Sequence, residues 1–336
     1  FFSFFVLLPI NLIASDYSTR SVYGGIGLIE NPTARFDPDG EFTFGISTDK
    51  PYHRIYSTMQ FLPWLEATLR YTEGTHTPYL SGGSQTWKDK GIDLKVRLLQ
   101  ESGRWPSVAA GFRDFGGTGA FSGEYIVASN RYSNIDFTLG MGWGTIASRG
   151  SIDNPVGWII ESQKIRGGGT SRGGTLNLKS LFSGEKVGFF GGLEYQTPIE
   201  GLSFKLEYDA NDHSNILGRE NIFFQSGDLI TQDSRINFAL DYSFPMSERD
   251  IVDLSIGMVR GNTIYANVSV GSNLNFVKER YTPPPEMLNK KTLQPFSDLN
   301  DGWQKYLTEL IIWQMANEGF ATHSLTFNDD EMIAEI

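Results

Sequence analysis

Residues 91–99 carry the pattern on which the interpretation of this chain rests, because apolar and charged residues alternate strictly along them. In a β-strand, successive side chains point to opposite faces, so this segment has one apolar face and one charged face. In a soluble sheet the apolar face would cover a core. In an outer-membrane barrel it would face lipid, and the charged face would line the lumen. The apolar positions are Ile92, Leu94, Val96 and Leu98, and the charged positions are Asp93, Lys95 and Arg97.

The same alternation recurs along most of the chain, in segments near the length that a tilted strand needs to cross a bilayer. An even number of such segments is what a single-chain antiparallel barrel requires. The sequence therefore predicts an all-β fold, a transmembrane antiparallel β-barrel of about 12 strands within residues 40–275. The predicted strands are 41–47, 54–61, 64–72, 91–99, 107–113, 124–129, 135–143, 187–195, 202–209, 236–244, 252–258 and 264–270.

The lengths of the connections between these strands support a barrel independently of the alternation. With the N-terminus in the periplasm, even-numbered connections should be short turns and odd-numbered connections can be long. The even-numbered connections are short, whereas the long gaps are all odd-numbered and cover residues 73–90, 114–123, 145–186 and 210–234. A soluble sandwich has no reason to follow this parity, so the loops favour the barrel.

The segments on either side of the barrel differ from it in composition. Residues 1–14 are apolar and predict a signal peptide, clipped at its N-terminus because no methionine precedes it; a buried apolar strand is the alternative. Residues 15–39 are glycine-rich and predict an extended lead-in, tucked into or under the barrel. Residues 276–298 contain three consecutive prolines and predict a stiff linker.

The C-terminal residues 299–336 predict the start of a small α/β domain that is truncated and lies in the periplasm. Apolar residues recur near helical spacing in 299–318 and predict an amphipathic helix. A short strand is expected at residues 321–327 and a second helix from residue 329 onward. This unit is too short to bury a core of its own.

Composition removes several classes of function. A net charge of −11 leaves no basic excess to neutralise phosphates, which argues against a nucleic-acid partner. The absence of cysteine removes disulfides, thiolate metal sites and a lipid-modified cysteine anchor. No apolar run is long enough for a transmembrane helix. The four histidines do not have metal-ligand spacing, so neither a metal nor another cofactor is expected.

Three motifs suggest chemistry and have a plainer interpretation. His213 and Ser214 could belong to a hydrolase site, but no GxSxG elbow accompanies them. The glycine-rich residues 166–174 look like a phosphate cradle without its GK[ST] ending, and we interpret them as a loop. Residues 114–119 could bind a cation through Asp114, although a tight turn is the preferred interpretation.

The polar faces of the strands are the better candidate site, because neighbouring strands bring opposite charges within reach in the lumen. For most of these residues we prefer a salt-bridged interior that holds the barrel in shape. The functional alternative is a polar conduit or binding surface for a sugar polymer. The candidate lumen-facing residues are Glu66, Arg70, Asp93, Lys95, Arg97, Arg113, Glu124, Lys205, Glu207 and Asp209.

Four tryptophans sit near the ends of predicted strands. Tryptophan is enriched where a barrel wall meets the membrane interface, so an anchoring girdle is the expected role. Stacking against sugar rings is the alternative. These residues are Trp64, Trp87, Trp105 and Trp143.

Several strings together resemble the YjbH/GfcD family of bacterial outer-membrane proteins, with the likeness strongest before residue 145. They lie at residues 21–28, 31–35, 62–66, 70–72, 88–95, 116–119, 124–125 and 139–144. The resemblance implies a β-barrel associated with exopolysaccharide or capsule export, in a family without established catalytic residues. It also implies full-length members about twice as long as this chain.

Taken with the resemblance, the sequence predicts a non-enzymatic barrel in the outer membrane of a Gram-negative bacterium, with its C-terminal part in the periplasm. Its role would be to assist exopolysaccharide export or assembly through a polar lumen. The expected partners are outer-membrane lipid, exopolysaccharide and proteins of the export operon. The alternatives are an outer-membrane enzyme that modifies lipid or polysaccharide, and a porin-like or structural barrel.

The barrel interpretation predicts heat-modifiable migration in gels. A folded barrel resists unfolding by detergent and migrates differently before and after boiling, because its hydrogen bonds close on themselves. The measurement is electrophoresis of the outer-membrane fraction with and without heating. Recovery of the protein in the soluble fraction with unchanged migration would contradict the prediction.

Overall fold

The computed structural model describes residues 19–78, 85–166, 180–213, 215–216, 219–220, 230–276, 296–328 and 331–335. The chain divides into two compact units after Phe276. The predicted signal peptide, residues 1–14, lies outside the described residues, as do most of the glycine-rich residues 166–174.

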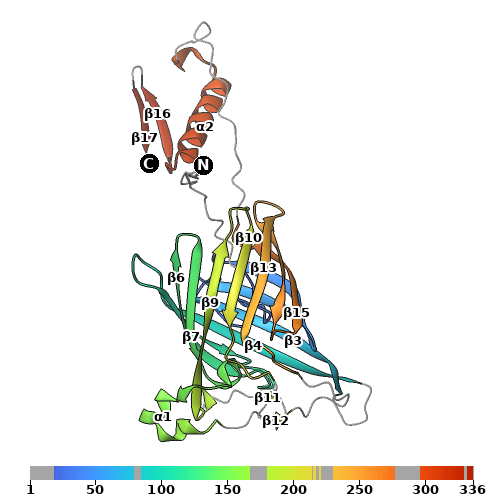
Figure 1. Cartoon of the computed structure of the whole chain (residues 1–336). Coiled ribbons are helices and arrows are strands. Elements are labelled where there is room, and N and C mark those ends of the chain that lie inside the picture. Colours follow the sequence, from blue (N-terminus) through green and yellow to red (C-terminus); the bar gives the residue numbers. More distant parts are fainter. Residues whose placement is uncertain are drawn as a thin grey trace, which may run out of the picture. The chain divides into compact units, whose positions relative to one another are not determined.

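Twelve antiparallel strands form a closed barrel in the first unit (Figure 1). The strands follow one another round the wall in chain order, β15 pairs with β1, and the barrel closes without a free edge. Each of the 12 predicted segments matches one of them, with no more than one residue outside the strand, so the predicted fold class is confirmed. They are β1 (Glu41–Asp49), β2 (Tyr52–Leu62), β3 (Leu65–Pro78), β4 (Thr86–Leu99), β5 (Ser107–Arg113), β6 (Gly123–Tyr132), β7 (Ile135–Gly142), β9 (Lys186–Gln196), β10 (Leu202–Tyr208), β13 (Ile236–Pro245), β14 (Asp250–Val259) and β15 (Thr263–Asn273).

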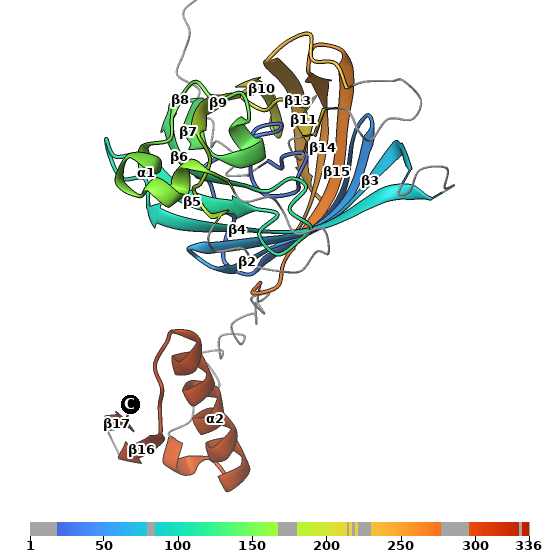
Figure 2. The ribbon, with the colours of Figure 1, turned by 90° about the horizontal axis from the view of Figure 1, so that it is seen from below.

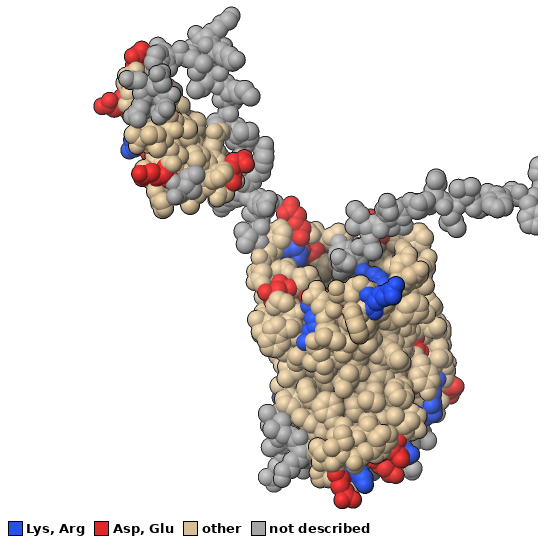
Figure 3. Space-filling model, turned by 90° about the vertical axis from the view of Figure 1, so that its left-hand side faces the viewer, with Lys and Arg blue, Asp and Glu red and all other residues tan. Residues whose placement is uncertain are grey.

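The wall is apolar outside and polar inside, the reverse of a soluble protein. Leu69 and Leu139 are 58% and 65% exposed on the outer face, whereas Lys205 and Glu207 are fully buried on the inner face. On the side that Figure 3 shows, a broad band of the barrel surface is free of charged side chains, and charges gather toward the two ends. An exposed apolar band of this size is stable against lipid and not against water.

Inward-facing aromatic rings lie over glycines on the neighbouring strand at three places around the wall. The paired positions are Gly45 with Tyr56, Gly111 with Tyr125, and Gly140 with Phe190. A Cβ atom on any of these glycines would come within about 2.4 Å of the ring opposite. Glycine therefore makes room for a large side chain in the barrel interior, as in known pairings that fix strand register.

The long connections lie at the end of the barrel opposite the start of β1. Their described residues contain three more short strands, one α-helix and two 3₁₀ helices. β3 and β4 extend well into the predicted gap 73–90, which is therefore mostly strand. Alternation is weak there because a strand that emerges beyond the bilayer no longer needs a lipid-facing side. The additional elements are η1 (Gly144–Ala147), β8 (Ile152–Asp153), α1 (Pro155–Ile159), η2 (Glu161–Lys164), β11 (Asn215–Ile216) and β12 (Arg219–Glu220).

The second unit contains η5 (Phe296–Asp298), one helix and a hairpin. Helix α2 (Asp301–Asn317) begins at Asn300, whose side chain accepts a hydrogen bond from Trp303 N at 3.0 Å. The hairpin comprises β16 (Ser324–Asn328) and β17 (Glu331–Glu335). Within the described part of the chain, no helix is long and apolar enough to cross a membrane.

The predicted second helix from residue 329 onward is wrong, because β17 occupies these residues. Five residues with three apolar side chains fit either structure by periodicity alone. Pairing with β16 settles the choice, since Met332 and Ile333 lie opposite Phe327 and Thr326.

A charge placed on the outer face should destabilise the barrel according to its depth in the bilayer. We expect Leu139→Arg, in the middle of β7, to lower the free energy of unfolding by about 2–4 kcal/mol. Tyr132→Arg, at the exposed end of β6, serves as the matched control and should cost ~0–1 kcal/mol. Urea unfolding in lipid vesicles measures both, and equal losses would show that the outer face does not contact lipid.

Candidate functional site

The lead-in folds into the barrel and fills it. We call residues 19–37 the plug. The residues from Thr19 to Ala34 are buried or nearly so, and Figure 2 shows this segment inside the ring of strands. Backbone hydrogen bonds within the plug, such as Val22 N to Ile29 O at 2.7 Å, fold it back on itself. Both of its ends lie toward the same mouth, because Thr19 bonds Glu194 and Arg35 bonds Asp136, near the short turns of the wall.

The carboxylate of Glu207 on β10 holds the turn of the plug. It accepts hydrogen bonds from three successive backbone amides, those of Ile29, Glu30 and Asn31, at 2.9–3.0 Å. The side-chain amide of Asn237 on β13 donates a further bond at 2.9 Å. Consecutive amides that converge on one carboxylate form an anion-binding nest, and here the anion belongs to the wall.

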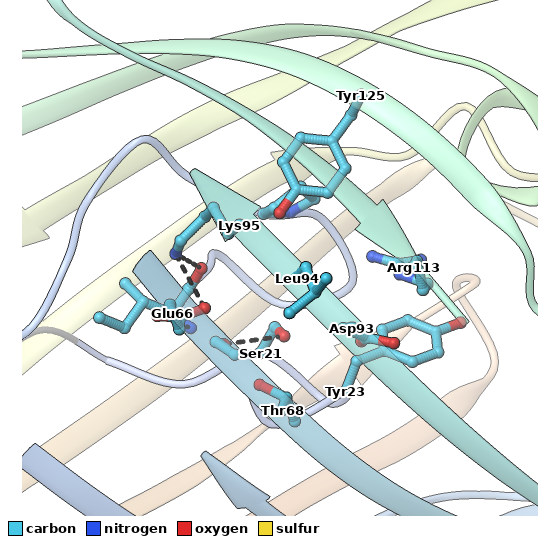
Figure 4. A pocket seen from close by; sticks show the side chains of 12 residues that line it. Ser21, Tyr23, Glu66, Thr68, Asp93, Leu94, Lys95, Arg113 and Tyr125 are labelled. Carbon is cyan, nitrogen blue, oxygen red and sulfur yellow. Dashed lines mark hydrogen bonds and ion pairs between the residues drawn. The ribbon is translucent and has the colours of Figure 1, made fainter. Parts of the chain in front are cut away.

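Two buried lysines of the wall donate hydrogen bonds to backbone carbonyl groups of the plug. Lys205 Nζ donates to Gly27 O at 3.1 Å and Leu28 O at 2.8 Å, and Lys95 Nζ donates to Ile26 O at 3.2 Å. Each lysine also has a carboxylate partner on a neighbouring strand. Lys95 lies 3.1 Å from Glu66, as Figure 4 shows, and Lys205 lies 3.5 Å from Asp241.

Small hydroxyl groups of the wall complete the contacts to the plug backbone. Ser47 Oγ donates to Val22 O at 2.6 Å, and Thr58 Oγ1 donates to Gly24 O at 2.9 Å. At Ala34, Ser129 Oγ accepts from the amide and Ser107 Oγ donates to the carbonyl, each at 2.9 Å. Buried backbone groups need such partners, so these hydroxyls let an irregular segment lie inside the barrel.

Arginines clamp the plug at its tip and at its exit. Near the tip, the guanidinium of Arg113 lies 3.8 Å from the centre of the Tyr23 ring and donates to Glu30 O at 2.8 Å. At the exit, Arg35 makes a two-pronged contact with Asp136 at 2.6 and 2.7 Å and also pairs with Glu101. Such bidentate pairs fix geometry as well as adding energy.

Loops from the long-connection end close the barrel over the plug tip. Phe121 inserts from the 114–122 loop and packs edge-on against Tyr23 and Tyr52. In the same loop, burial and the nearby Asp89 carboxylate raise the pKa of Asp114 to about 7. Arg166 reaches over from the next loop and pairs with Glu124 at 2.8 Å, so Glu124 serves the closure of this end.

His213 lies buried under these loops, bound by Asp209 at 2.6 Å, with Glu30 of the plug 4.0 Å away. Burial alone would lower the pKa of the imidazole, but the two carboxylates outweigh it and raise the pKa above its ordinary value. The histidine therefore favours its charged form between two acids. Ser214, its predicted companion, lies outside the described residues.

A small cavity remains between the plug and the wall. A cavity of about 20 Å³ lies between Ser21, Tyr23 and Gly25 of the plug and the wall residues Glu66 and Lys95 (Figure 4). A volume of this size holds about one water molecule. No group of residues suited to a metal ion occurs within the described ranges.

The structure places the ten candidate residues in different roles. Seven contact the plug: Glu66, Arg70, Lys95, Arg97, Arg113, Lys205 and Glu207. Asp93 pairs with Arg70 at 2.6 Å, and Arg97 lies against the ring of Phe36 at 4.5 Å. Glu124 and Asp209 belong to the closed outer end.

The tryptophan girdle is correct in part. Trp64 and Trp105 are exposed at the short-turn end, as an interface anchor requires. Trp143 is buried, and its indole donates to Asn154 at 2.9 Å, so its predicted outward position is wrong. Trp87 packs on Phe121 inside the barrel. Both face inward because loop residues fold over the wall at that end.

Sequence reasoning missed the residues whose role depends on the plug. Ser47 and Thr58 lie at polar positions of predicted strands, so the alternation could have identified them as lumen-facing. Phe121 and Asn154 lie in loops, where no periodicity exists to indicate an inward direction.

Comparison with known proteins places the chain in a family context. A family model described as YjbH, "Exopolysaccharide biosynthesis protein YbjH", matches residues 19–336. The chain is also similar to the "Uncharacterized lipoprotein YjbH" of Escherichia coli (strain K12), with 36% identity over 267 residues. This match covers 78% of the chain and 36% of the relative, so the chain spans about a third of the relative's length.

Among solved structures, two porins match the chain at low similarity. A KdgM porin matches at 9% identity with a TM-score of 0.37, and a NanC porin at 9% identity with a TM-score of 0.34. Each match covers 70% of this chain and 99% of the porin. Likeness at this level carries no argument about function.

The nest predicts that Glu207→Gln will loosen the plug. The substitution keeps the size of the side chain but replaces the charged acceptor by a neutral amide. We expect the free energy that holds the turn of the plug against the wall to fall by about 1.5–3 kcal/mol. Hydrogen exchange at the amides of residues 29–31 should then be roughly 10- to 100-fold faster, since each 1.4 kcal/mol is a factor of ten.

The matched control is Ser243→Ala, which removes a buried hydroxyl that donates to Asp253 on the neighbouring wall strand at 2.5 Å. Exchange at residues 29–31 should not change in this variant. Equal acceleration in both variants would mean that the barrel as a whole, rather than the nest, sets plug mobility.

Proposed function

The chain belongs to the YjbH family of exopolysaccharide biosynthesis proteins, and on that premise we propose that it assists exopolysaccharide export or assembly as a plugged outer-membrane barrel. The plug closes the lumen in the resting state. Its withdrawal toward the periplasm opens a polar path along which the glycan passes or docks.

The plug is the observation that carries this proposal. A barrel of 12 strands could be narrowed by side chains of its own wall, yet a separate segment with its own fold fills this one. Both ends of the plug lie toward one mouth, and every contact that holds it is non-covalent. Such a segment can leave without threading through the wall.

The wall that the plug covers suits a hydrated sugar polymer. Lysine, arginine and carboxylate side chains lie among serine and threonine hydroxyls on the inner face, and several of them bond the plug backbone. Sugars carry the same mixture of hydroxyl donors and acceptors that the plug backbone offers. The glycan could therefore replace the plug without leaving buried polar groups unpaired.

The orientation follows from the loops. We place the short turns and both ends of the barrel sequence in the periplasm, as bacterial barrels do, and the long connections outside the cell. The C-terminal unit then lies in the periplasm. There it can meet the glycan and partner proteins of the export system before they reach the barrel.

The proposed role needs no covalent chemistry. His213 has its ring bound by Asp209 beneath closed loops, which suits a structural part better than a catalytic base. We therefore infer a non-enzymatic function.

A disulfide that locks the plug tests the proposal in cells that export the glycan. A Cβ atom on Gly25 would lie 3.5 Å from Thr68 Oγ1 on β3, with only the flexible end of Glu66 in the way. Residues 1–336 contain no cysteine, so within this part of the protein Gly25→Cys and Thr68→Cys can bridge only with each other. In the full-length protein, we expect surface glycan to fall to the level of a strain that lacks the protein, and to recover on addition of a reductant.

The two single-cysteine variants are the controls and should export normally, because neither can form the bridge. The bridge itself is checked by the difference in gel migration with and without reductant. Normal export by the bridged protein would overturn the gated path and leave a closed barrel that acts as a platform.

A further inference from the structure

The connection between β7 and β9 exposes a compact apolar surface. Four bulky side chains on α1, on η2 and at their ends face solvent, and the most exposed is Ile159 at 87%. We call these residues the rim patch. It comprises Trp158, Ile159, Ile160 and Ile165.

The rim patch is held rigidly by the side chain of Asn154. Its oxygen accepts from the Trp143 indole at 2.9 Å and from Val156 N at 3.0 Å, which caps α1. Its amide nitrogen donates to the carbonyls of Phe182 and Gly184, each at 2.9 Å. A buried asparagine with this many partners holds the connection between β7 and β9 in place on the barrel. The rim patch is therefore kept facing outward.

The rim patch continues the outer face of the wall. Ile152 of β8, three residues before α1, pairs with Val187 at the start of β9. Phe189, which is exposed on the outer face, is two residues further along β9, about 7 Å away at 3.3 Å per residue. Figures 1 and 2 both show α1 at the rim of the barrel and not over its mouth.

We propose that the rim patch lies in the outer leaflet of the membrane, at the boundary between headgroups and acyl chains. One tryptophan and three isoleucines beside the lipid-facing wall match the composition of interfacial anchors. The nearby charges pair with each other, Lys164 with Glu161 and Lys186 with Asp153, and so leave no charge pattern that would select a protein partner.

An anchor here would fix the height of the barrel and the position of the loop that holds Glu124. Through Arg166, the same connection closes the outer end of the lumen. The membrane surface thereby stabilises the closed outer end.

Spin labels test the proposal, because the chain contains no cysteine. Nitroxide is attached to Trp158→Cys or Ile159→Cys in the full chain, reconstituted in vesicles of outer-membrane lipid. Collision with oxygen reports lipid, and collision with a water-soluble nickel complex reports water. Leu139→Cys is the lipid-facing reference, and Asn262→Cys, in an exposed turn at the same end, is the aqueous reference.

We expect the oxygen-to-nickel collision ratio at both rim positions to lie near the Leu139 value and several-fold above the Asn262 value. A ratio equal to that at Asn262 would overturn the proposal and leave a protein partner. A ratio that changes when the protein is diluted with lipid would also overturn it, because a second copy would then cover the patch at the higher protein concentration. Heat-modifiable migration checks that each labelled barrel is folded.

Discussion

The pairing of buried wall charges with the backbone of the plug is the interaction on which the rest of this structure depends. A lysine or carboxylate away from water is costly unless partners satisfy it. Glu207 meets three amides of the plug, and Lys205 meets two of its carbonyls. The buried charges of the wall and the buried backbone groups of the plug therefore satisfy each other, because each would lack these hydrogen-bond partners without the other.

The lipid outside and the plug inside together explain the distribution of side chains. Apolar residues face outward, where a soluble protein would not place them, and polar residues face inward, where a filled interior requires hydrogen bonds. Aromatic rings over Gly45, Gly111 and Gly140 fill the space that the plug leaves. The closed state follows from this packing, since the cavity beside Lys95 has room for about one water molecule.

Family membership and the plug lead to one account of function. The family is one of exopolysaccharide biosynthesis proteins, and in the function that we propose the barrel is a polar path for the glycan that the plug shuts. The rim patch adds a reason for the outer loops to stay closed, because they are held at the membrane surface. On this account, opening begins at the periplasmic mouth, where Arg35 clamps the plug to Asp136 and Glu101.

The alternation of residues was sufficient to place the 12 strands and the direction of their faces, because lipid imposes a period of two on every strand that crosses it. Where lipid does not reach, the pattern failed. The strand extensions within residues 73–90, the inward Trp143 and the β17 strand could not be predicted from the sequence pattern, since these depend on contacts with other parts of the chain.

The same limit applies to the site. Alternation indicated that Glu207 and Lys95 face inward, but their partners are backbone groups of the plug, which any sequence carries. Only the folded chain, in which residues nearly 180 apart meet, could show that these charges hold a plug.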